Sequence, residues 1–157
     1  MSERAVAHHT FVIERSYPKP PEAVFLAFSD PAKKRRWFLL GDGFEVGETT
    51  MDFRVGGKDS SSFRANVAPV EGLVFRNDTV YQDIVQDQRI VFAYTMATGD
   101  HRISASLATF EFLKSAEGTT LVFTEQAAFF ENADGPEMRK QGWTELLNQL
   151  ARELETN

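Results

Sequence analysis

Six segments between residues 44 and 130 alternate apolar and polar residues, and short turns separate the later ones. Alternation with a period of two is typical of strands that bury one face of a sheet. Connections this short join neighbouring antiparallel strands. The alternating segments are 44–57, 60–69, 73–86, 89–98, 101–114 and 119–130. They predict an antiparallel meander, and the apolar face of such a sheet needs a cover.

Two short helices are expected before the meander. Residues 9–17 predict a first strand, and Pro18 ends it because proline cannot donate to a strand ladder. Residues 20–30 then predict a short helix that begins with proline. Asp30 followed by Pro31 is typical of an N-cap and a first helical residue, so a second short helix is expected there.

One long amphipathic helix is expected after the meander. It is predicted to begin at Asp134, with Glu137 three residues later as in a capping box, and to end near Leu154. Its apolar stripe consists of Trp143, Leu146, Leu147, Leu150 and Leu154. Because the sequence offers no other long apolar stripe, we expect an α+β fold in which a curved antiparallel sheet wraps around this helix.

The composition excludes several classes of protein. The 157 residues fit one domain, 1–157, and 42% hydrophobic with 25% charged residues is a globular balance. The formal net charge of −6 opposes nucleic-acid binding. The chain has no cysteine, so disulfides and thiolate metal sites are excluded. Neither a membrane span nor a signal-peptide pattern is present in the sequence, so a cytoplasmic location is expected.

The sequence contains no motif that predicts a metal, a cofactor or a catalytic residue. His8, His9 and His101 lack the spacing and the neighbouring carboxylates of a metal site. No glycine-rich loop joins a strand to a helix start, which leaves a phosphate site unsupported. The basic run 33–36 is interpreted as the solvated end of a short helix.

Four segments resemble one known family in the same order along the chain. They are AVFLAFSDPAKKRRWF, YQDIVQDQRIVFAYTM, GTTLVFTEQAAFF and RKQGWTELLNQLARELE. The chain thereby resembles bacterial relatives of the activator of the heat-shock-protein-90 ATPase, within the START-like (SRPBCC) superfamily. The resemblance covers about residues 10–155. It implies the helix-grip fold, with an interior cavity between the curved sheet and the C-terminal helix.

The abundance of phenylalanine, 14 of 157 residues, fits either a large core or the walls of an apolar cavity. Small residues on the concave side of the sheet favour a cavity, because a filled core needs volume there. Simple core packing is the alternative reading of every aromatic residue in this set. The predicted lining consists of Phe25, Phe28, Trp37, Phe38, Phe53, Phe63, Phe92, Tyr94, Met96, Ser104, Ser106, Phe110, Phe123, Glu125, Trp143 and Leu147.

Glu125 shares one side of its strand with Leu121 and Phe123. A buried carboxylate is costly unless it is paired or solvated. Either it points into a cavity, or a bulge before Phe129 turns it outward. If it points inward, its pKa should be raised by desolvation, and it would orient a ligand or act as a general acid or base. The candidate partners are Tyr94, Arg54, Arg64 and Arg102.

The sequence leaves three candidate functions. Members of the superfamily that this chain resembles bind lipids, sterols, hormones or polyketides. The leading hypothesis from the resemblance is therefore a module that binds a small apolar or amphipathic molecule. A cyclase- or hydrolase-like enzyme that uses Glu125 is the second, and a module that acts on a chaperone ATPase is the third. Whether two copies form a homodimer is left open.

Overall fold

The computed structural model describes residues 5–39, 44–66 and 72–156. It confirms the predicted α+β order. In chain order the elements are β1 (Ala7–Tyr17), α1 (Pro21–Ser29), α2 (Pro31–Lys34), the π-helical turn η1 (Arg35–Leu39), β2 (Phe44–Thr50), β3 (Lys58–Ala65), β4 (Val74–Val85), β5 (Arg89–Thr98), β6 (His101–Ser115), β7 (Gly118–Phe129) and α3 (Pro136–Glu155). The last part of the predicted segment 60–69 lies outside the described residues, and the extent of the domain stays a prediction.

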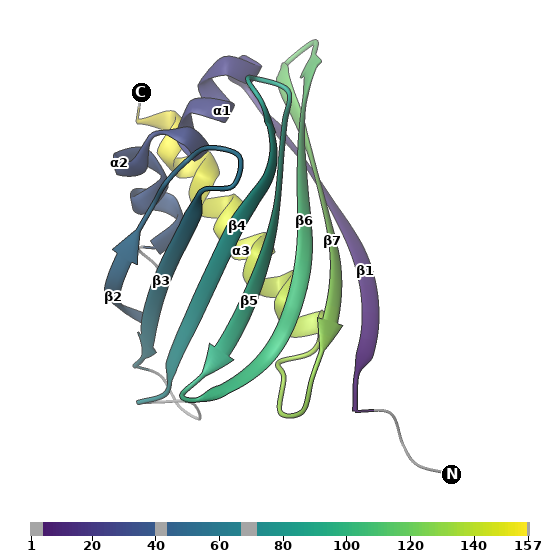
Figure 1. The fold of residues 1–157 in the computed structure, drawn as a ribbon. Coiled ribbons are helices and arrows are strands. Elements are labelled where there is room, and N and C mark those ends of the chain that lie inside the picture. The colour runs from purple at the N-terminus through teal and green to yellow at the C-terminus, as the bar shows by residue number, and fades with distance from the viewer. Residues whose placement is uncertain (1–4, 40–43, 67–71, 157) are drawn as a thin grey trace.

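The seven strands form one antiparallel sheet in the order β1-β7-β6-β5-β4-β3-β2. Strands β2 to β7 follow one another as the predicted meander, and β1 pairs with β7 along its whole length. The short helices therefore connect the two edges of the sheet (Figure 1). Register shifts in β2–β3, β4–β5 and β5–β6 mark bulges, which add bend and twist to strands.

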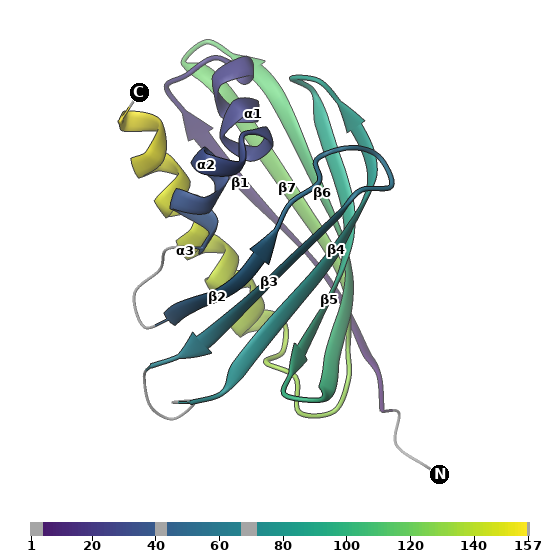
Figure 2. The same cartoon turned by 60° about the vertical axis from the view of Figure 1, so that its left-hand side comes forward.

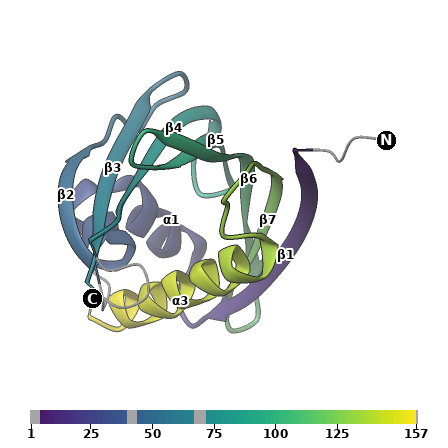
Figure 3. The ribbon, with the colours of Figure 1, turned by 90° about the horizontal axis from the view of Figure 1, so that it is seen from below.

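The curved sheet wraps around α3, which lies across the gap between the edge strands (Figures 2 and 3). The predicted stripe of α3 faces inward, with Trp143, Leu147, Leu150 and Leu154 buried. Beneath it the rings of Phe110 and Phe123 stack with centroids 4.5 Å apart, and the Trp143 ring lies 4.6 Å from that of Phe123. The chain's own side chains thus fill the space between α3 and strands β6 and β7.

The short helices pack their aromatic residues into the same core. Asp30 caps α2 as predicted, because its carboxylate accepts the N–H of Ala32 at 3.0 Å. Phe28 contacts the ring of Phe110 at 5.0 Å, and the Trp37 indole N–H donates to the carbonyl of Ala27 at 2.8 Å.

The start of α3 differs from the prediction. Its N-cap is Gly135 with φ of 89°, and Pro136 is the first helical residue. Asp134 does not cap the helix, since both of its carboxylate oxygens accept hydrogen bonds from Arg139 at 2.8 Å. An ion pair with a buried arginine has replaced the expected capping box.

The sequence predicts neither a membrane span nor a metal site, and two observations bear on these points among the described residues. No helix among them is long and apolar enough to cross a membrane. In the same part of the chain, no group of three or more histidine, aspartate or glutamate side chains could hold a metal ion.

Candidate functional site

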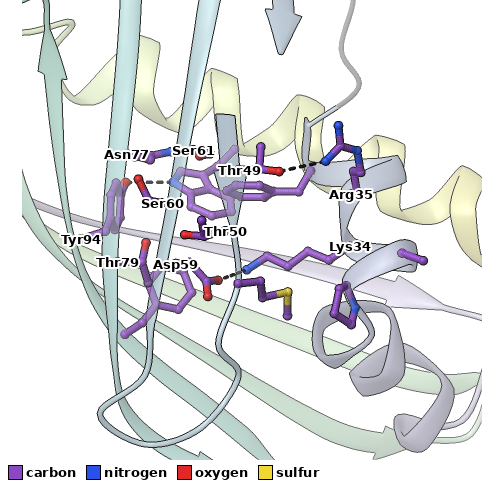
Figure 4. Close-up of a pocket in the computed structure, with 16 residues that line it drawn as sticks. Lys34, Arg35, Thr49, Thr50, Asp59, Ser60, Ser61, Asn77, Thr79 and Tyr94 are labelled. Carbon is purple, nitrogen blue, oxygen red and sulfur yellow. Dashed lines mark hydrogen bonds and ion pairs between the residues drawn. The ribbon is translucent and has the colours of Figure 1, made fainter. Parts of the chain in front are cut away.

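A cavity of about 310 Å³ lies on the concave side of the sheet, between α2–η1 and strands β2 to β5 (Figure 4). Its volume is at the lower end of the range of small-molecule sites. α3 reaches the cavity through Trp143. The cavity therefore lies beside the filled core under α3, toward the edge of the sheet that the short helices cover.

One wall of the cavity carries short polar side chains. Strands β2, β3 and β4 place hydroxyl and amide groups there, so the inward positions hold little volume. Ser61 and Asn77 face each other in register on β3 and β4. The Oδ1 atom of Asn77 is buried and has no hydrogen-bond partner among the described residues. These polar residues are Thr49, Thr50, Ser60, Ser61, Asn77 and Thr79.

A second group of lining residues is aromatic. Phe38 comes from η1, Phe92 from β5 and Trp143 from α3, and the Phe38 and Trp143 centroids lie 5.9 Å apart. Tyr94 adds its ring and its hydroxyl, and Met51 adds a thioether chain. The cavity thus offers both apolar rings and hydrogen-bonding groups to a ligand.

Lys34 and Asp59 form an ion pair at 3.2 Å in the cavity wall, and each side chain is 14% exposed. The ammonium of Lys34 also donates to the hydroxyl of Tyr81 at 3.1 Å, and that hydroxyl donates to Asp59. Desolvation lowers the pKa of Lys34, and the neighbouring carboxylate opposes this change. The ammonium lies 5.0 Å from the centre of the Phe38 ring, within cation–π distance.

The basic run 33–36 is a solvated helix end only in part, because Arg35 and Arg36 are exposed whereas the side chain of Lys34 is only 14% exposed. The π-helical turn that follows α2 directs its side chains differently. Lys34 lies in the cavity wall, Arg35 donates to the hydroxyl of Thr49 at 2.8 Å, and Arg36 pairs with buried Glu153 at 2.7 Å. The charges that looked like a surface feature fix the short helices to β2, β3 and α3.

Glu125 points inward and is fully buried. Strand β7 keeps continuous register with both neighbours at this position, which excludes the outward-turning bulge. Its Oε1 atom accepts hydrogen bonds from the Tyr94 hydroxyl and, at 3.1 Å, from the Trp143 indole. Arg139 lies 3.7 Å from Oε2. Burial raises the pKa of Glu125 although these partners oppose the rise.

The partner of Glu125 was predicted only in part. Tyr94 is a partner as expected, whereas Arg54 and Arg64 and Arg102 are exposed. The guanidinium is supplied by Arg139, which also donates to Ser104 at 2.9 Å. Arg139 precedes Trp143 by four residues on the same face of α3, so helical spacing could have identified it.

The sixteen predicted lining residues separate into three groups. Phe38, Phe92, Tyr94 and Trp143 lie in the cavity wall. Glu125 and Ser104 lie behind Tyr94 and Trp143 in the hydrogen-bonded network. Ser106 is buried on β6, the strand that also carries Ser104. The remaining residues pack away from the cavity, either in the core or against its margin: Phe25, Phe28, Trp37, Phe53, Phe63, Met96, Phe110, Phe123 and Leu147.

Sequence reasoning missed the polar wall and the ion pair beside it. Alternation identified inward positions on several strands, but it drew attention to aromatic residues rather than to Asp59, and it assigned no inward face to the strand that carries Asn77 and Thr79. Asp59 gave one signal, because a carboxylate at an inward strand position needs a partner. Lys34 gave none, since it stands in a run of four basic residues.

A curved antiparallel sheet that grips a long C-terminal helix and leaves a cavity beside it is the helix-grip, START-like architecture. Residues 18–155 match the family model for activator of Hsp90 ATPase homolog 1-like protein. The chain belongs to this family, as the resemblance of its four segments predicted.

Solved structures agree with this assignment. A Rhizobium loti protein is 47% identical over 96% of this chain and 99% of its own, with a TM-score of 0.84. A Rhizobium leguminosarum protein is 38% identical over 99% of this chain and 100% of its own, with a TM-score of 0.89. An AHSA1-like protein from Aeromonas hydrophila, 20% identical over 94% and 93%, shares the fold with a TM-score of 0.70. Comparison with curated proteins gave no match.

Proposed function

We propose that this protein binds a small amphipathic molecule in the cavity between α2–η1 and strands β2 to β5. The single observation that carries the proposal is the cavity itself, about 310 Å³ with a polar and an aromatic wall. Ligand sites are typically hollows in which apolar walls surround a few placed polar groups.

A core that served stability alone would be built differently. Interiors are normally close-packed, and empty volume beside large side chains reduces stability. Buried polar groups normally have hydrogen-bond partners, yet Oδ1 of Asn77 in this wall has none among the described residues. A ligand that covers Phe92 and Trp143 would fill the empty volume.

The test is to block the cavity with a longer side chain. Thr79→Leu places an apolar chain in the wall, and Thr95→Leu makes the same change at a half-buried position on the neighbouring strand outside the wall. Isothermal titration with 2-naphthol, 2-naphthoate, decanol and decanoate should detect binding to the wild type. We expect Thr79→Leu to weaken binding by about tenfold or more, a loss of about 1.4 kcal/mol, and Thr95→Leu to leave it unchanged.

Absence of binding by all four compounds would contradict the proposal. So would equal binding by the wild type and Thr79→Leu, because the ligand would then lie elsewhere. Circular dichroism of both variants separates a blocked cavity from a disrupted fold.

The family gives a second candidate function, activation of a chaperone ATPase. The support is family membership. Stimulation of a purified chaperone's ATPase by the wild-type protein would favour this function, and the Thr79→Leu variant would show whether it depends on the cavity.

The enzyme hypothesis based on Glu125 has less support from the geometry. Glu125 is fully buried behind Tyr94 and Trp143 and is not part of the cavity wall. A general acid or base must come within hydrogen-bond reach of the reacting atoms.

A further inference from the structure

We propose that the ligand is an organic monoanion whose acidic group is bound by Lys34 and Arg35. Its apolar body would lie against Phe38, Phe92 and Trp143. This inference rests on the proposed binding function and adds the charge and the orientation of the ligand.

The lining of the cavity has an excess of positive charge. The charged lining residues are Lys34, Arg35 and Asp59, so the wall has one positive charge in excess. The chain as a whole has a formal net charge of −6. A local excess of positive charge in an acidic protein favours an anion at this place, and focusing in a hollow strengthens the effect.

Both oxygens of the Asp59 carboxylate already accept hydrogen bonds from the protein. Its Oδ1 atom accepts the backbone N–H of Asp52 at 3.0 Å. Its Oδ2 atom accepts from both Tyr81 and Lys34. Little acceptor capacity remains for a donor group on a ligand, so Asp59 positions Lys34 rather than attracting a cation.

The two cations in the lining, Lys34 and Arg35, keep N–H donors that their hydrogen bonds do not use. An ammonium has three N–H groups, and the hydrogen bonds of Lys34 to Asp59 and Tyr81 use two of them. Arg35 has five, and one of these donates to Thr49 at 2.8 Å. Within the described part of the chain, Arg35 forms no ion pair. Both side chains extend from the helical side toward the polar wall (Figure 4).

The size and chemistry of the remaining wall define the rest of the ligand. A cavity of about 310 Å³ suits one or two fused rings or a medium-length chain. Phe38 and Trp143 offer aromatic surface to such a body, while the hydroxyl of Thr49 accepts a hydrogen bond from Arg35 at 2.8 Å. The acidic group would therefore bind beside the exposed Arg35, and the apolar body would extend toward α3.

The test compares acids with neutral molecules of the same shape. Isothermal titration at pH 7 should show that 2-naphthoate binds about tenfold more tightly than 2-naphthol. Decanoate should bind more tightly than decanol by the same factor. Charge-assisted hydrogen bonds contribute about this much binding free energy. Arg35→Gln should remove most of this preference and leave naphthol binding within about threefold. Lys33→Gln is the matched control, because it removes an adjacent charge that does not line the cavity.

Lys34→Met alone would leave Asp59 without its cation, so the second variant is Lys34→Met combined with Asp59→Asn. It should also lose the preference for the acids. Equal binding of acids and neutral compounds by the wild type, or an unchanged preference in Arg35→Gln, would overturn the anion inference while the proposed binding function stands. If no compound binds, both fail.

Discussion

The concave side of the sheet has two halves that are filled in different ways. Under α3, strands β6 and β7 direct large rings inward, and Phe110, Phe123 and Trp143 pack face to face or edge to face. Beside α2–η1, strands β3 and β4 direct Ser61, Asn77 and Thr79 inward, and a cavity remains. The same curved sheet surrounds both halves (Figure 3). Side-chain volume alone does not decide where the hollow lies, because Ser104, Ser106 and Ala108 are also small and buried on β6 and do not line the cavity.

The largest expected effect comes from emptying the filled half. Phe110→Ala removes a fully buried ring that contacts Phe28, Phe92, Phe123 and Trp143, so we expect a loss of about 3–5 kcal/mol of unfolding free energy. Urea denaturation of the wild type and the variant measures it.

Thr79→Ala is the comparison variant for this measurement. Because Thr79 already borders empty volume, the change should lower the unfolding free energy by less than about 1 kcal/mol. Equal losses for Phe110→Ala and Thr79→Ala would show that the two halves do not differ in packing.

The next largest effect comes from the buried ion pair behind the filled half. Arg139→Met removes the only cation within 4 Å of Glu125 among the described residues, from a pair in which the arginine is 5% exposed and the glutamate is fully buried. This change should lower the unfolding free energy by about 3 kcal/mol. Denaturation at pH 7 measures this loss. The double variant Arg139→Met with Glu125→Gln should recover most of it, and a double variant as unstable as Arg139→Met would contradict this cause.

The sequence predicted the inward faces better than it predicted the site. Alternation with a period of two identified the inward residues of β5, β6 and β7 because burial on one face leaves a clear pattern. The same pattern allowed an inward Glu125 but left an outward-turning bulge open, and the continuous register of β7 excludes the bulge. The pattern contains no information about how far α3 lies from each strand, so it could not separate a filled region from an open one.

The sequence also did not predict the ion pairs between distant segments. Lys34 meets Asp59, and Arg36 meets Glu153, across 25 and 117 residues. Such pairs depend on how α2 and η1 cross the sheet, and no local pattern specifies that path. Local signals with a mechanism, such as Asp30 as N-cap, were confirmed.

The smallest expected effect is a pH dependence that belongs to the filled half. Burial raises the pKa of Glu125 in the folded protein above its unfolded value, which lies near 4.5. The folded state then holds the proton more tightly than the unfolded state does. The stability from this protonation is fully present below the unfolded pKa and is lost as the pH rises through the folded pKa.

Glu125→Gln lacks this titration, whereas the other ionisable groups stay the same in both proteins. The unfolding free energy of the wild type minus that of Glu125→Gln should therefore be largest at acidic pH and fall as the pH rises to 8. Urea denaturation at several pH values between 4 and 8 measures this difference, and Thr95→Leu should follow the wild type at each pH. A difference that stays constant or increases with pH would mean that Tyr94, Trp143 and Arg139 stabilise the ionised carboxylate more than burial destabilises it.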